Sequence, residues 1–434
     1  MFGTSGIRGP VGETVTADLA LSVGRALGVD SDRVVVGRDP RESGELLVDA
    51  LAAGLRESGT DVVELGTAAT PTVARAVAWA DADAGVAVTA SHNPAPDNGL
   101  KLWQPSGQAF DDPMQVEITE RIESGETDLA AWDGLGTRER GDYRQRHVDA
   151  LVESVDIEDP PSVVVDIGNG AGGVVVDALQ ALGCRVETLN AQPDGAFPGR
   201  PSEPTAENCR SLATLVGESD AELGIAHDGD ADRMRAATGE GEFVSGDVLL
   251  AILARAAADP GQRIAAPVDT SMAVDDYLAE NDVTVTRTRV GDVYVAERVT
   301  DADVAFGGEP SGAWIWPEAT LCPDGPLAAV KLTALAAERP LADRVADVNT
   351  YPIRRDSVEV TDKAAVMERI ADRVEAEFSD VTTLDGVRVG LEDGWFLLRA
   401  SGTQPLVRIT AEARDGERAA ALFERASEIL EDER

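Results

Sequence analysis

The stretch Arg33-Val-Val-Val-Gly-Arg-Asp39 sets the pattern from which the fold of this chain can be read. It is a short, β-branched apolar run that ends in polar residues, which is typical of a strand in the middle of a sheet. A helical stretch at about 46–58 follows, and then a second strand at 61–65. A further helix near 71–79 and a third strand at 85–90 complete a unit of alternating strands and helices.

The same unit occurs twice more along the chain. The second copy comprises strands at 162–166, 185–189 and 222–226, with helices at 174–182 and about 207–217 between them. The third and fainter copy comprises strands at 263–268, 283–288 and 302–306, with helices at 272–280 and 293–299. Strands that alternate with amphipathic helices predict parallel α/β layers, and each copy is about the size of a domain.

The last part of the chain has a different pattern. The strand-like runs Trp395-Phe-Leu-Leu-Arg399 and Val407-Arg-Ile-Thr410 flank a Ser-Gly-Thr turn, and a helix at 417–431 closes the chain. The predicted fold class is therefore α/β, with three related α/β domains of mixed, largely parallel sheets and a C-terminal α+β domain. The predicted boundaries are 1–142, 143–245, 246–347 and 348–434.

The charge of the chain excludes several classes of partner. A net charge of −41 disfavours binding to nucleic acid and to anionic lipid. Of the 38 basic residues only three are lysines, a composition that we interpret as adaptation to molar salt, where the Debye length falls to about 3 Å. With no run of 18 apolar residues and no apolar segment near Met1, we expect neither a membrane span nor a signal peptide.

Three well-separated cysteines and three histidines support neither a disulfide framework nor a Cys/His zinc site. The expected location is therefore the reducing cytoplasm.

A polar loop follows the last strand of each copy. These loops are Thr89-Ala-Ser-His-Asn-Pro94, His227-Asp-Gly-Asp-Ala-Asp-Arg233 and Gly307-Gly-Glu-Pro-Ser-Gly312. Ligands of open α/β sheets bind beyond the carboxyl ends of the strands, so three such loops are expected to face one shared cleft.

The second loop carries the strongest chemical signal. Asp228, Asp230 and Asp232 stand at i, i+2 and i+4, so that alternate carboxylates of one loop can converge on a hard cation, for which Mg²⁺ is the best candidate. An EF-hand is excluded because Arg233 stands where glycine is required. A solvated acidic turn and an enzyme with Asp228 as phosphoryl-accepting nucleophile remain alternatives.

Ser91 follows an apolar strand and can be either a phosphoryl carrier or a turn residue. Ten residues later comes Lys101, one of the three lysines of the chain. A lysine can be tuned for proton transfer whereas arginine stays charged, which favours a chemical role for Lys101 over a surface one.

Three further stretches carry groups that suit an anion or a sugar. Phe2-Gly-Thr-Ser-Gly-Ile-Arg-Gly9 surrounds Arg8 with glycines and hydroxyls, although a flexible terminus would look similar. Arg399-Ala-Ser-Gly-Thr-Gln-Pro-Leu-Val-Arg408 combines two guanidiniums, two hydroxyls and a glycine turn, as a phosphate clamp requires. The third loop offers Glu309 and Ser311 for sugar hydroxyls, with a structural turn as the alternative.

Together these motifs resemble the α-D-phosphohexomutase family, and the resemblance spans the whole chain. The resemblance implies four domains around a central cleft, one Mg²⁺ per chain, and a phosphoserine that acts through a hexose 1,6-bisphosphate intermediate. The reaction it implies interconverts hexose 6-phosphate and hexose 1-phosphate, with a hexose or hexosamine phosphate as the small-molecule partner. A monomer or a homodimer is expected.

The resemblance assigns roles to individual residues. Catalytic roles fall to Ser91, Lys101, Arg8 and His92, and metal ligation to Ser91, Asp228, Asp230 and Asp232, with Arg233 beside them. Sugar contacts fall to Glu309, Ser311, Gly291 and Asp292. Phosphate contacts fall to Arg399, Ser401, Gly402, Thr403 and Arg408.

Two departures bear on the substrate. Ala313 follows the sugar loop where many relatives have histidine, and Gln404 replaces a frequent glutamate. The segment Arg289-Val-Gly-Asp292 resembles phosphoglucosamine mutases most closely, with phosphoglucomutase/phosphomannomutase activity as the alternative. Alternatives of another class are a sugar-phosphate hydrolase with Asp228 as nucleophile and a non-catalytic sugar-phosphate sensor.

Overall fold

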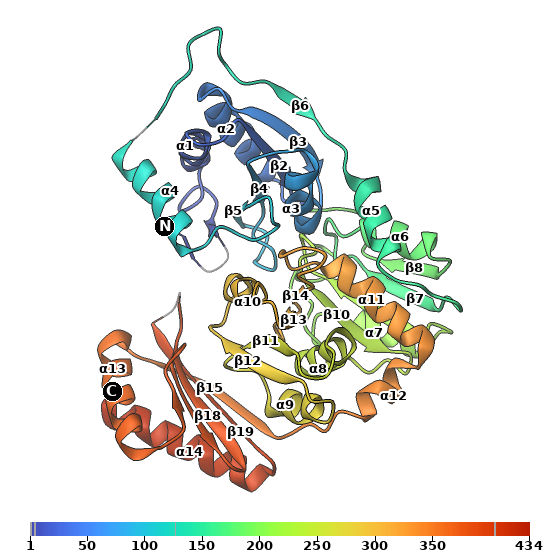
Figure 1. Ribbon diagram of the computed structural model, residues 1–434, viewed down its shortest axis with the longest axis vertical. Helices are drawn as coiled ribbons and strands as arrows, with labels where there is room; N and C mark the ends of the chain where they lie inside the picture. Colours follow the sequence, from blue (N-terminus) through green and yellow to red (C-terminus); the bar gives the residue numbers. More distant parts are fainter. Residues whose placement is uncertain (1, 4–5, 126, 403–404) are drawn as a thin grey trace. The chain divides into compact units, whose positions relative to one another are not determined.

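The computed structural model describes all residues except 1, 4–5, 126 and 403–404 (Figure 1). The chain forms two compact units. The first comprises Met1–Leu249 and Ser311–Val345, and the second comprises Leu250–Pro310 and Ala346–Arg434. Thr403, one of the predicted phosphate contacts, lies outside the described residues.

The first unit contains a six-stranded sheet in the order β1-β5-β4-β2-β3-β6. Its strands are β1 (Ile7–Pro10), β2 (Arg33–Arg38), β3 (Asp61–Thr67), β4 (Ala84–Val88), β5 (Asp97–Trp103) and β6 (Arg138–Arg140). Strands β4, β2, β3 and β6 run parallel, whereas β5 pairs antiparallel with both β4 and β1. The carboxyl end of β4 and the chain entering β5 therefore meet at one edge of the sheet, where the loop with Ser91 lies.

Helices cover both faces of this sheet. Helices α1 (Ala17–Gly28), α2 (Gly44–Glu57) and α4 (Asp112–Ser124) contribute to one core cluster with strand residues such as Val34 and Val36. Thr16 caps α1 by accepting from the N–H of Leu19, an interaction that fixes the start of the helix. Helix α3 (Thr70–Trp79) contacts β2 and β4.

The second sheet of this unit has the order β10-β9-β7-β8. Its strands are β7 (Ser162–Asp166), β8 (Arg185–Leu189), β9 (Leu223–His227) and β10 (Met234–Thr238). Three are parallel and β10 is antiparallel to β9, so the acidic loop lies at the β9–β10 hairpin. The remaining elements are α5 (Arg144–Glu153), α6 (Val174–Ala181), α7 (Arg210–Gly217), β14 (Trp314–Ile315) and α11 (Gly325–Glu338).

Helix α8 (Gly246–Ala257) carries the chain from the first unit into the second. There β11 (Arg263–Pro267) pairs in parallel with β12 (Thr284–Thr288) and β13 (Val304–Gly308), accompanied by α9 (Met272–Ala279) and α10 (Asp292–Arg298). A five-stranded antiparallel sheet follows in the order β15-β19-β18-β17-β16. Its strands are β15 (Ile353–Glu359), β16 (Val381–Thr382), β17 (Val387–Leu391), β18 (Gly394–Ala400) and β19 (Leu406–Ala413).

Helices α13 (Lys363–Glu377) and α14 (Gly416–Glu433) share a core cluster with this antiparallel sheet. Short helix α12 (Leu341–Ala346) precedes it along the chain. Glu412 is fully buried between this sheet and α9, where it accepts from Ser271 Oγ, the Met272 N–H and Trp395 Nε1. A buried carboxylate with three donors fixes the two parts of the second unit against each other.

The predicted fold class is confirmed. The three α/β copies share one arrangement, since the predicted strands pair in the orders β4-β2-β3, β9-β7-β8 and β13-β11-β12. The sequence analysis did not identify the antiparallel strands β5 and β10 that follow the polar loops. They are the reason that each loop is a strand-to-strand connection rather than a strand-to-helix one. No helix among the described residues is long and apolar enough to cross a membrane.

The crossing of α1 and α2 depends on two glycines. A Cβ atom at Gly54 would lie 2.2 Å from the Leu21 carbonyl oxygen, and one at Gly24 would lie 2.3 Å from the Leu51 carbonyl oxygen. The two helices therefore pack backbone to backbone, and no side chain larger than hydrogen fits at these positions.

We expect Gly54→Ala to lower the free energy of unfolding by about 1–3 kcal/mol, although alanine is the better helix former by about 1 kcal/mol. Urea denaturation in molar KCl measures this difference. Gly416→Ala is the matched control, because Gly416 begins α14 with nothing within 4 Å of the added carbon. Equal stability of the two variants would contradict the close helix crossing.

Candidate active site

Ser91 lies in the loop between β4 and β5, with its side chain buried against Asp228 of the acidic loop. The Ser91 Oγ donates to Asp228 Oδ2 at 2.5 Å. Ser91 has φ of 49°, in the left-handed region that a serine adopts at a cost, and it is only 1% exposed. Such a conformation persists only where the surroundings fix it, which directs attention to the groups that hold the loop.

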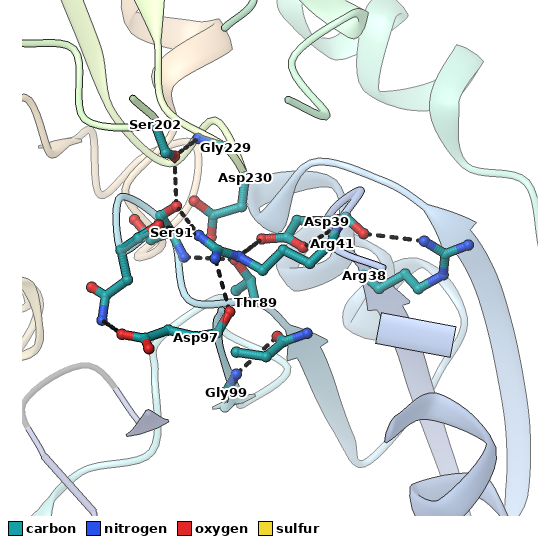
Figure 2. Close-up of polar contacts among 12 residues, drawn as sticks. Arg38, Asp39, Arg41, Thr89, Ser91, Asp97, Gly99, Ser202, Gly229 and Asp230 are labelled. Atoms are coloured by element: carbon teal, nitrogen blue, oxygen red, sulfur yellow. Dashed lines mark hydrogen bonds and ion pairs between the residues drawn. The ribbon is translucent and has the colours of Figure 1, made fainter. Parts of the chain in front are cut away.

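The guanidinium of Arg41 is hydrogen-bonded to the backbone of the loop that carries Ser91, here called the serine loop (Figure 2). Arg41 is 1% exposed, and it donates to three carbonyl oxygens of the loop and to that of Asp97, the first residue of β5. The acceptors are the carbonyls of Ser91 (2.9 Å), Asn93 (2.7 Å), Pro94 (2.6 Å) and Asp97 (2.8 Å). Because guanidinium is planar and rigid, these bonds fix the path of the whole loop.

Asp39 completes this arrangement. Its carboxylate accepts from Arg41 Nε at 2.9 Å and from Thr89 Oγ1 at 2.8 Å, and Thr89 Oγ1 in turn accepts from the Ser91 N–H at 2.8 Å. Burial raises the pKa of Asp39, while the Arg41 charge and the donated hydrogen bonds oppose that rise. The sequence analysis missed Asp39 and Arg41. The available signal was the polar end of the first predicted strand, at Arg38 and Asp39, where β2 ends.

The second α/β copy repeats this device. Asp166, the last residue of β7, accepts from Arg200 Nε at 2.6 Å, and both side chains are buried. Arg200 also donates to the carbonyls of Ser202 (3.2 Å) and His227 (2.6 Å). The residue that precedes the acidic loop is thereby fixed just as the serine loop is fixed by Arg41.

Asp228, Asp230 and Asp232 form a compact acidic cluster. Each of them offers a carboxylate oxygen that lies within 4.8 Å of the others, and all three are buried. Asp230 Oδ2 accepts from Thr70 Oγ1 at 2.6 Å, whereas no donor among the described residues reaches Asp230 Oδ1. Burial and the charges of Asp232 and Asp230 raise the pKa of Asp228 well above its usual range.

Buried carboxylates that repel one another and leave an oxygen without a donor are the environment that a divalent cation stabilises. An all-oxygen donor set of this kind suits Mg²⁺, Mn²⁺ or Ca²⁺ rather than zinc. The residues present therefore fit a divalent metal.

Basic side chains surround the acidic cluster and Ser91. Lys101 on β5 is 2% exposed and lies with Nζ 3.7 Å from Asp232 Oδ2 and 4.7 Å from the Trp103 ring centroid. Arg8 on β1 pairs in register with Gly99 on β5, and its buried Nε has no hydrogen-bond partner among the described residues. The backbone N–H of Arg233 donates to Asp228 Oδ1 at 3.2 Å, and the positive charge of its side chain opposes the rise of the Asp228 pKa. This mixture of buried charges suits an anion that bridges a cation and the basic residues.

His92 lies next to Ser91, with Nδ1 3.3 Å from Ser91 Oγ. Burial lowers the pKa of His92 to about 2, helped by the charges of Arg233, Arg8, Arg41 and Lys101. The imidazole is therefore neutral at working pH, and any part in proton transfer falls to its uncharged form.

The second unit holds most of the predicted sugar contacts. Glu309 Oε1 accepts from the Gly291 N–H at 2.7 Å, and Gly291 has φ of 134°, a conformation that favours glycine. Asp292 follows as the first residue of α10 and is 8% exposed. Ser311 belongs to the first unit, just before Gly312, whose carbonyl accepts from the Met234 N–H at 2.9 Å.

The predicted phosphate contacts of the second unit are paired strand neighbours. Arg399 on β18 is the register partner of Arg408 on β19, so the two basic residues come together. Arg399 Nη1 lies 3.5 Å from Asp385 Oδ2, and that carboxylate also accepts from the Val290 N–H at 3.0 Å. Ser401 is buried and its carbonyl accepts from Lys363 Nζ, while Gly402 has nothing within 4 Å of an added Cβ.

The structure thus gathers Ser91, His92, Lys101, Arg8, Arg233 and the three aspartates in the first unit. Glu309, Gly291 and Asp292 come together in the second unit, as do Arg399 and Arg408.

Comparison with known families identifies the class of protein that carries this site. Four models of phosphoglucomutase/phosphomannomutase domains match in chain order: α/β/α domain I over residues 1–128, domain II over 145–241, domain III over 245–351 and the C-terminal domain over 357–429. The chain belongs to this family of phosphohexomutases, and it is an isomerase of that class.

Two similar curated relatives carry one description. A protein of Methanococcoides burtonii described as "Probable phosphoglucosamine mutase" is 45% identical over 436 residues, with 100% of this chain and 99% of the relative covered. A protein of Methanothermobacter thermautotrophicus with the same description is 46% identical over 443 residues, with 99% and 98% covered. A phosphoglucomutase/phosphomannomutase family protein from Burkholderia thailandensis has a solved structure with a TM-score of 0.88 and 29% identity, covering 99% and 98%.

We expect Asp230→Asn to weaken Mn²⁺ binding by at least about tenfold, because it removes a charge but keeps the shape and the Thr70 contact. Isothermal titration of the metal-free protein in molar KCl measures the affinity. Asp220→Asn, at an exposed position, is the matched control and should bind as the parent protein does. Unchanged affinity in Asp230→Asn would exclude this carboxylate as a ligand.

We expect Arg41→Met to cost about 3–5 kcal/mol of unfolding free energy, since it leaves Asp39 charged and buried without its partner. Arg25→Met breaks the half-exposed pair with Glu57 and should cost only about 0–1 kcal/mol. Urea titrations of both variants provide the comparison. A loss for Arg41→Met no larger than that for Arg25→Met would show that the serine loop does not depend on this guanidinium.

Proposed function

We propose that this chain is a phosphoserine-dependent mutase that interconverts the 6-phosphate and 1-phosphate of glucosamine. The observation that carries the proposal is the 2.5 Å contact between Ser91 Oγ and Asp228 Oδ2, inside a buried acidic cluster with basic residues around it. This contact brings a hydroxyl that can carry a phosphoryl group to the place where a metal-binding cluster can neutralise its charge. The family membership supports the same reaction type.

In this proposal Asp228, Asp230, Asp232 and an oxygen borne by Ser91 would hold one Mg²⁺. When bound, the ion neutralises charge on the transferring phosphoryl group. Arg8 and Arg233 supply further positive charge from the protein side, and Lys101, beside Asp232, is the candidate for moving the proton of the sugar hydroxyl.

The proposed reaction has two transfers. A sugar hydroxyl loses its proton and attacks the phosphorus atom carried by Ser91, the bond from Ser91 Oγ to phosphorus breaks, and a hexose 1,6-bisphosphate forms. After the bisphosphate has reoriented in the site, Ser91 Oγ attacks its other phosphorus, and the sugar oxygen on that phosphorus leaves with a proton. Charge and mass balance without an outside cofactor, and the bisphosphate serves as intermediate and activator.

We assign substrate contacts in this scheme to two groups. Glu309, Ser311, Gly291 and Asp292 contact the sugar, and Arg399, Ser401, Gly402, Thr403 and Arg408 hold the phosphate that does not react. The pairing of Arg399 with Arg408 in register supports the second group, since two adjacent guanidiniums suit one dianion.

Glucosamine phosphate is proposed because the Methanococcoides and Methanothermobacter relatives are described as probable phosphoglucosamine mutases. Glucose and mannose phosphates are the second candidates, supported by the family's own description and by the Burkholderia structure. A hydrolase with Asp228 as nucleophile is less well supported, because both oxygens of that carboxylate already accept hydrogen bonds, from Ser91 Oγ and the Arg233 N–H.

The charge of −41 and the scarcity of lysine further support a protein that works in the cytoplasm at molar salt. A phosphorylated serine, one magnesium ion and a monomeric or homodimeric state complete the proposal. Nucleic acid and membrane are not expected as partners of so acidic a surface.

The proposed reaction predicts conversion of glucosamine 6-phosphate in molar KCl with Mg²⁺ and trace bisphosphate, faster than conversion of glucose 1-phosphate or mannose 1-phosphate. A preparation charged with labelled bisphosphate should contain an acid-stable, hydroxylamine-resistant phosphoenzyme. Ser91→Ala should lose both the label and at least about a thousandfold of the rate.

Asp220→Asn serves again as the exposed control. A phosphoenzyme that hydroxylamine cleaves would indicate an acyl phosphate and contradict the serine mechanism. Faster turnover of glucose or mannose phosphate would move the substrate assignment to the second candidate.

A further inference from the structure

Ser202 connects the serine loop to the acidic loop through a single hydroxyl group (Figure 2). Its Oγ accepts from the Gly229 N–H at 2.9 Å and donates to the Ser91 carbonyl oxygen at 2.8 Å. Ser202 is 3% exposed, and it comes from the segment between β8 and α7 rather than from either loop. The hydroxyl thus joins the backbones of two loops that belong to different α/β copies.

At this point the two loops leave no room for a side chain at Gly229. A Cβ atom at Gly229 would lie 2.8 Å from Ser202 Oγ and 3.0 Å from the Ser91 carbonyl oxygen. Gly229 therefore lets the acidic loop approach the serine loop until one oxygen atom fills the space between them. The bridge sets the separation of the loops directly.

Buried guanidiniums fix both ends of this bridge. Arg41 Nη2 donates to the same Ser91 carbonyl at 2.9 Å, and Arg200 Nη1 donates to the Ser202 carbonyl at 3.2 Å. Each arginine is anchored by a buried aspartate of its own copy. Ser202 is therefore held by one copy and bonded to the other.

The bridge differs from the direct contact in what phosphorylation does to it. The bond from Ser91 Oγ to Asp228 requires the hydroxyl proton, which is absent once Oγ carries a phosphoryl group. The Ser202 bridge uses only a backbone N–H and a backbone carbonyl, neither of which changes in the reaction. The bond from Thr70 Oγ1 to Asp230 also survives, but it ties the acidic loop to α3 rather than to the serine loop.

We infer that Ser202 is a positioning residue that keeps the phosphoryl group of Ser91 aligned with the acidic cluster in both the free and the phosphorylated enzyme. This inference rests on the proposed phosphoserine function. Without the bridge, the Ser91 carbonyl keeps its bond from Arg41, but the two loops of the phosphoenzyme lose a hydrogen-bonded tie that phosphorylation leaves intact. Misplacement of reacting atoms by about 1 Å can slow transfer by about a hundredfold.

Ser202→Ala tests the inference when its phosphoenzyme is mixed with sugar phosphate and single-turnover transfer is followed. The expected result is transfer slowed by about 10–100-fold, with Mn²⁺ affinity and sugar-phosphate KM within about twofold of the parent protein. Thr60→Val is the matched control, because it deletes another buried hydroxyl, bonded to the Ser31 carbonyl at 2.7 Å, away from both loops. It should transfer at the parent rate.

Two results would overturn the inference. One is transfer by Ser202→Ala within about twofold of the parent rate, and the other is an equal loss of Mn²⁺ affinity and transfer, which would make Ser202 a support of the acidic loop alone. If Ser202→Ala does not fold, Ser202→Cys replaces it, since its thiol is a weak donor of similar size. An intermediate rate supports the inference and the parent rate contradicts it.

The parent protein separates this inference from the proposed function. If the parent phosphoenzyme transfers nothing to any hexose phosphate, the proposed function fails. If the parent transfers and Ser202→Ala transfers equally well, only the role of Ser202 fails.

Discussion

The burial of three carboxylates beside a strained serine is the constraint on which the rest of the first unit depends. Asp228, Asp230 and Asp232 repel one another. Burial raises the pKa of Asp228, and the charges of the other two carboxylates raise it further. Like charges in a buried loop destabilise the fold unless a cation or fixed donors compensate. The Ser91 backbone adds a conformational cost of its own. The residues around the serine loop and the acidic loop offset these two costs.

The chain meets this constraint with the same device in each of its first two copies. A buried aspartate at the end of the first strand anchors an arginine, Asp39 with Arg41 and Asp166 with Arg200, and the arginine donates to carbonyls of the functional loop. Buried ion pairs add little net stability, but they specify one geometry where every donor is used. Each copy thus fixes its own loop with one aspartate–arginine pair, so the two loops can differ in chemistry although they are supported in the same way.

Much of this architecture could be predicted from the sequence, because strand and helix periods are local properties. The strands β7 and β8 begin and end at the predicted residues, and the loops with Ser91 and Asp228 follow the predicted strands. The antiparallel strands β5 and β10 were missed, since each comes directly after a polar loop. Their role is visible only in the structure, where each pairs with the strand that precedes its loop.

Residue type and spacing were enough to select Ser91, Lys101 and the acidic cluster as candidates, and the structure places these groups together. The residues that support them could not be selected in this way. Arg41 and Ser202 act through carbonyls far away in sequence, and a lone arginine or serine gives no local sign of such bonds. Reactive residues therefore leave a local signature in the sequence, whereas the residues that hold them in place do not.

The proposed chemistry requires one cation between Ser91 and the acidic cluster. Anomalous diffraction from a crystal soaked in Mn²⁺ tests this. The account predicts one strong peak about 2.2 Å from oxygens of Asp228, Asp230 and Asp232, with an oxygen borne by Ser91 completing the set. A peak elsewhere in the chain, or a cluster that stays without metal while Mn²⁺ binds at another site, would contradict it.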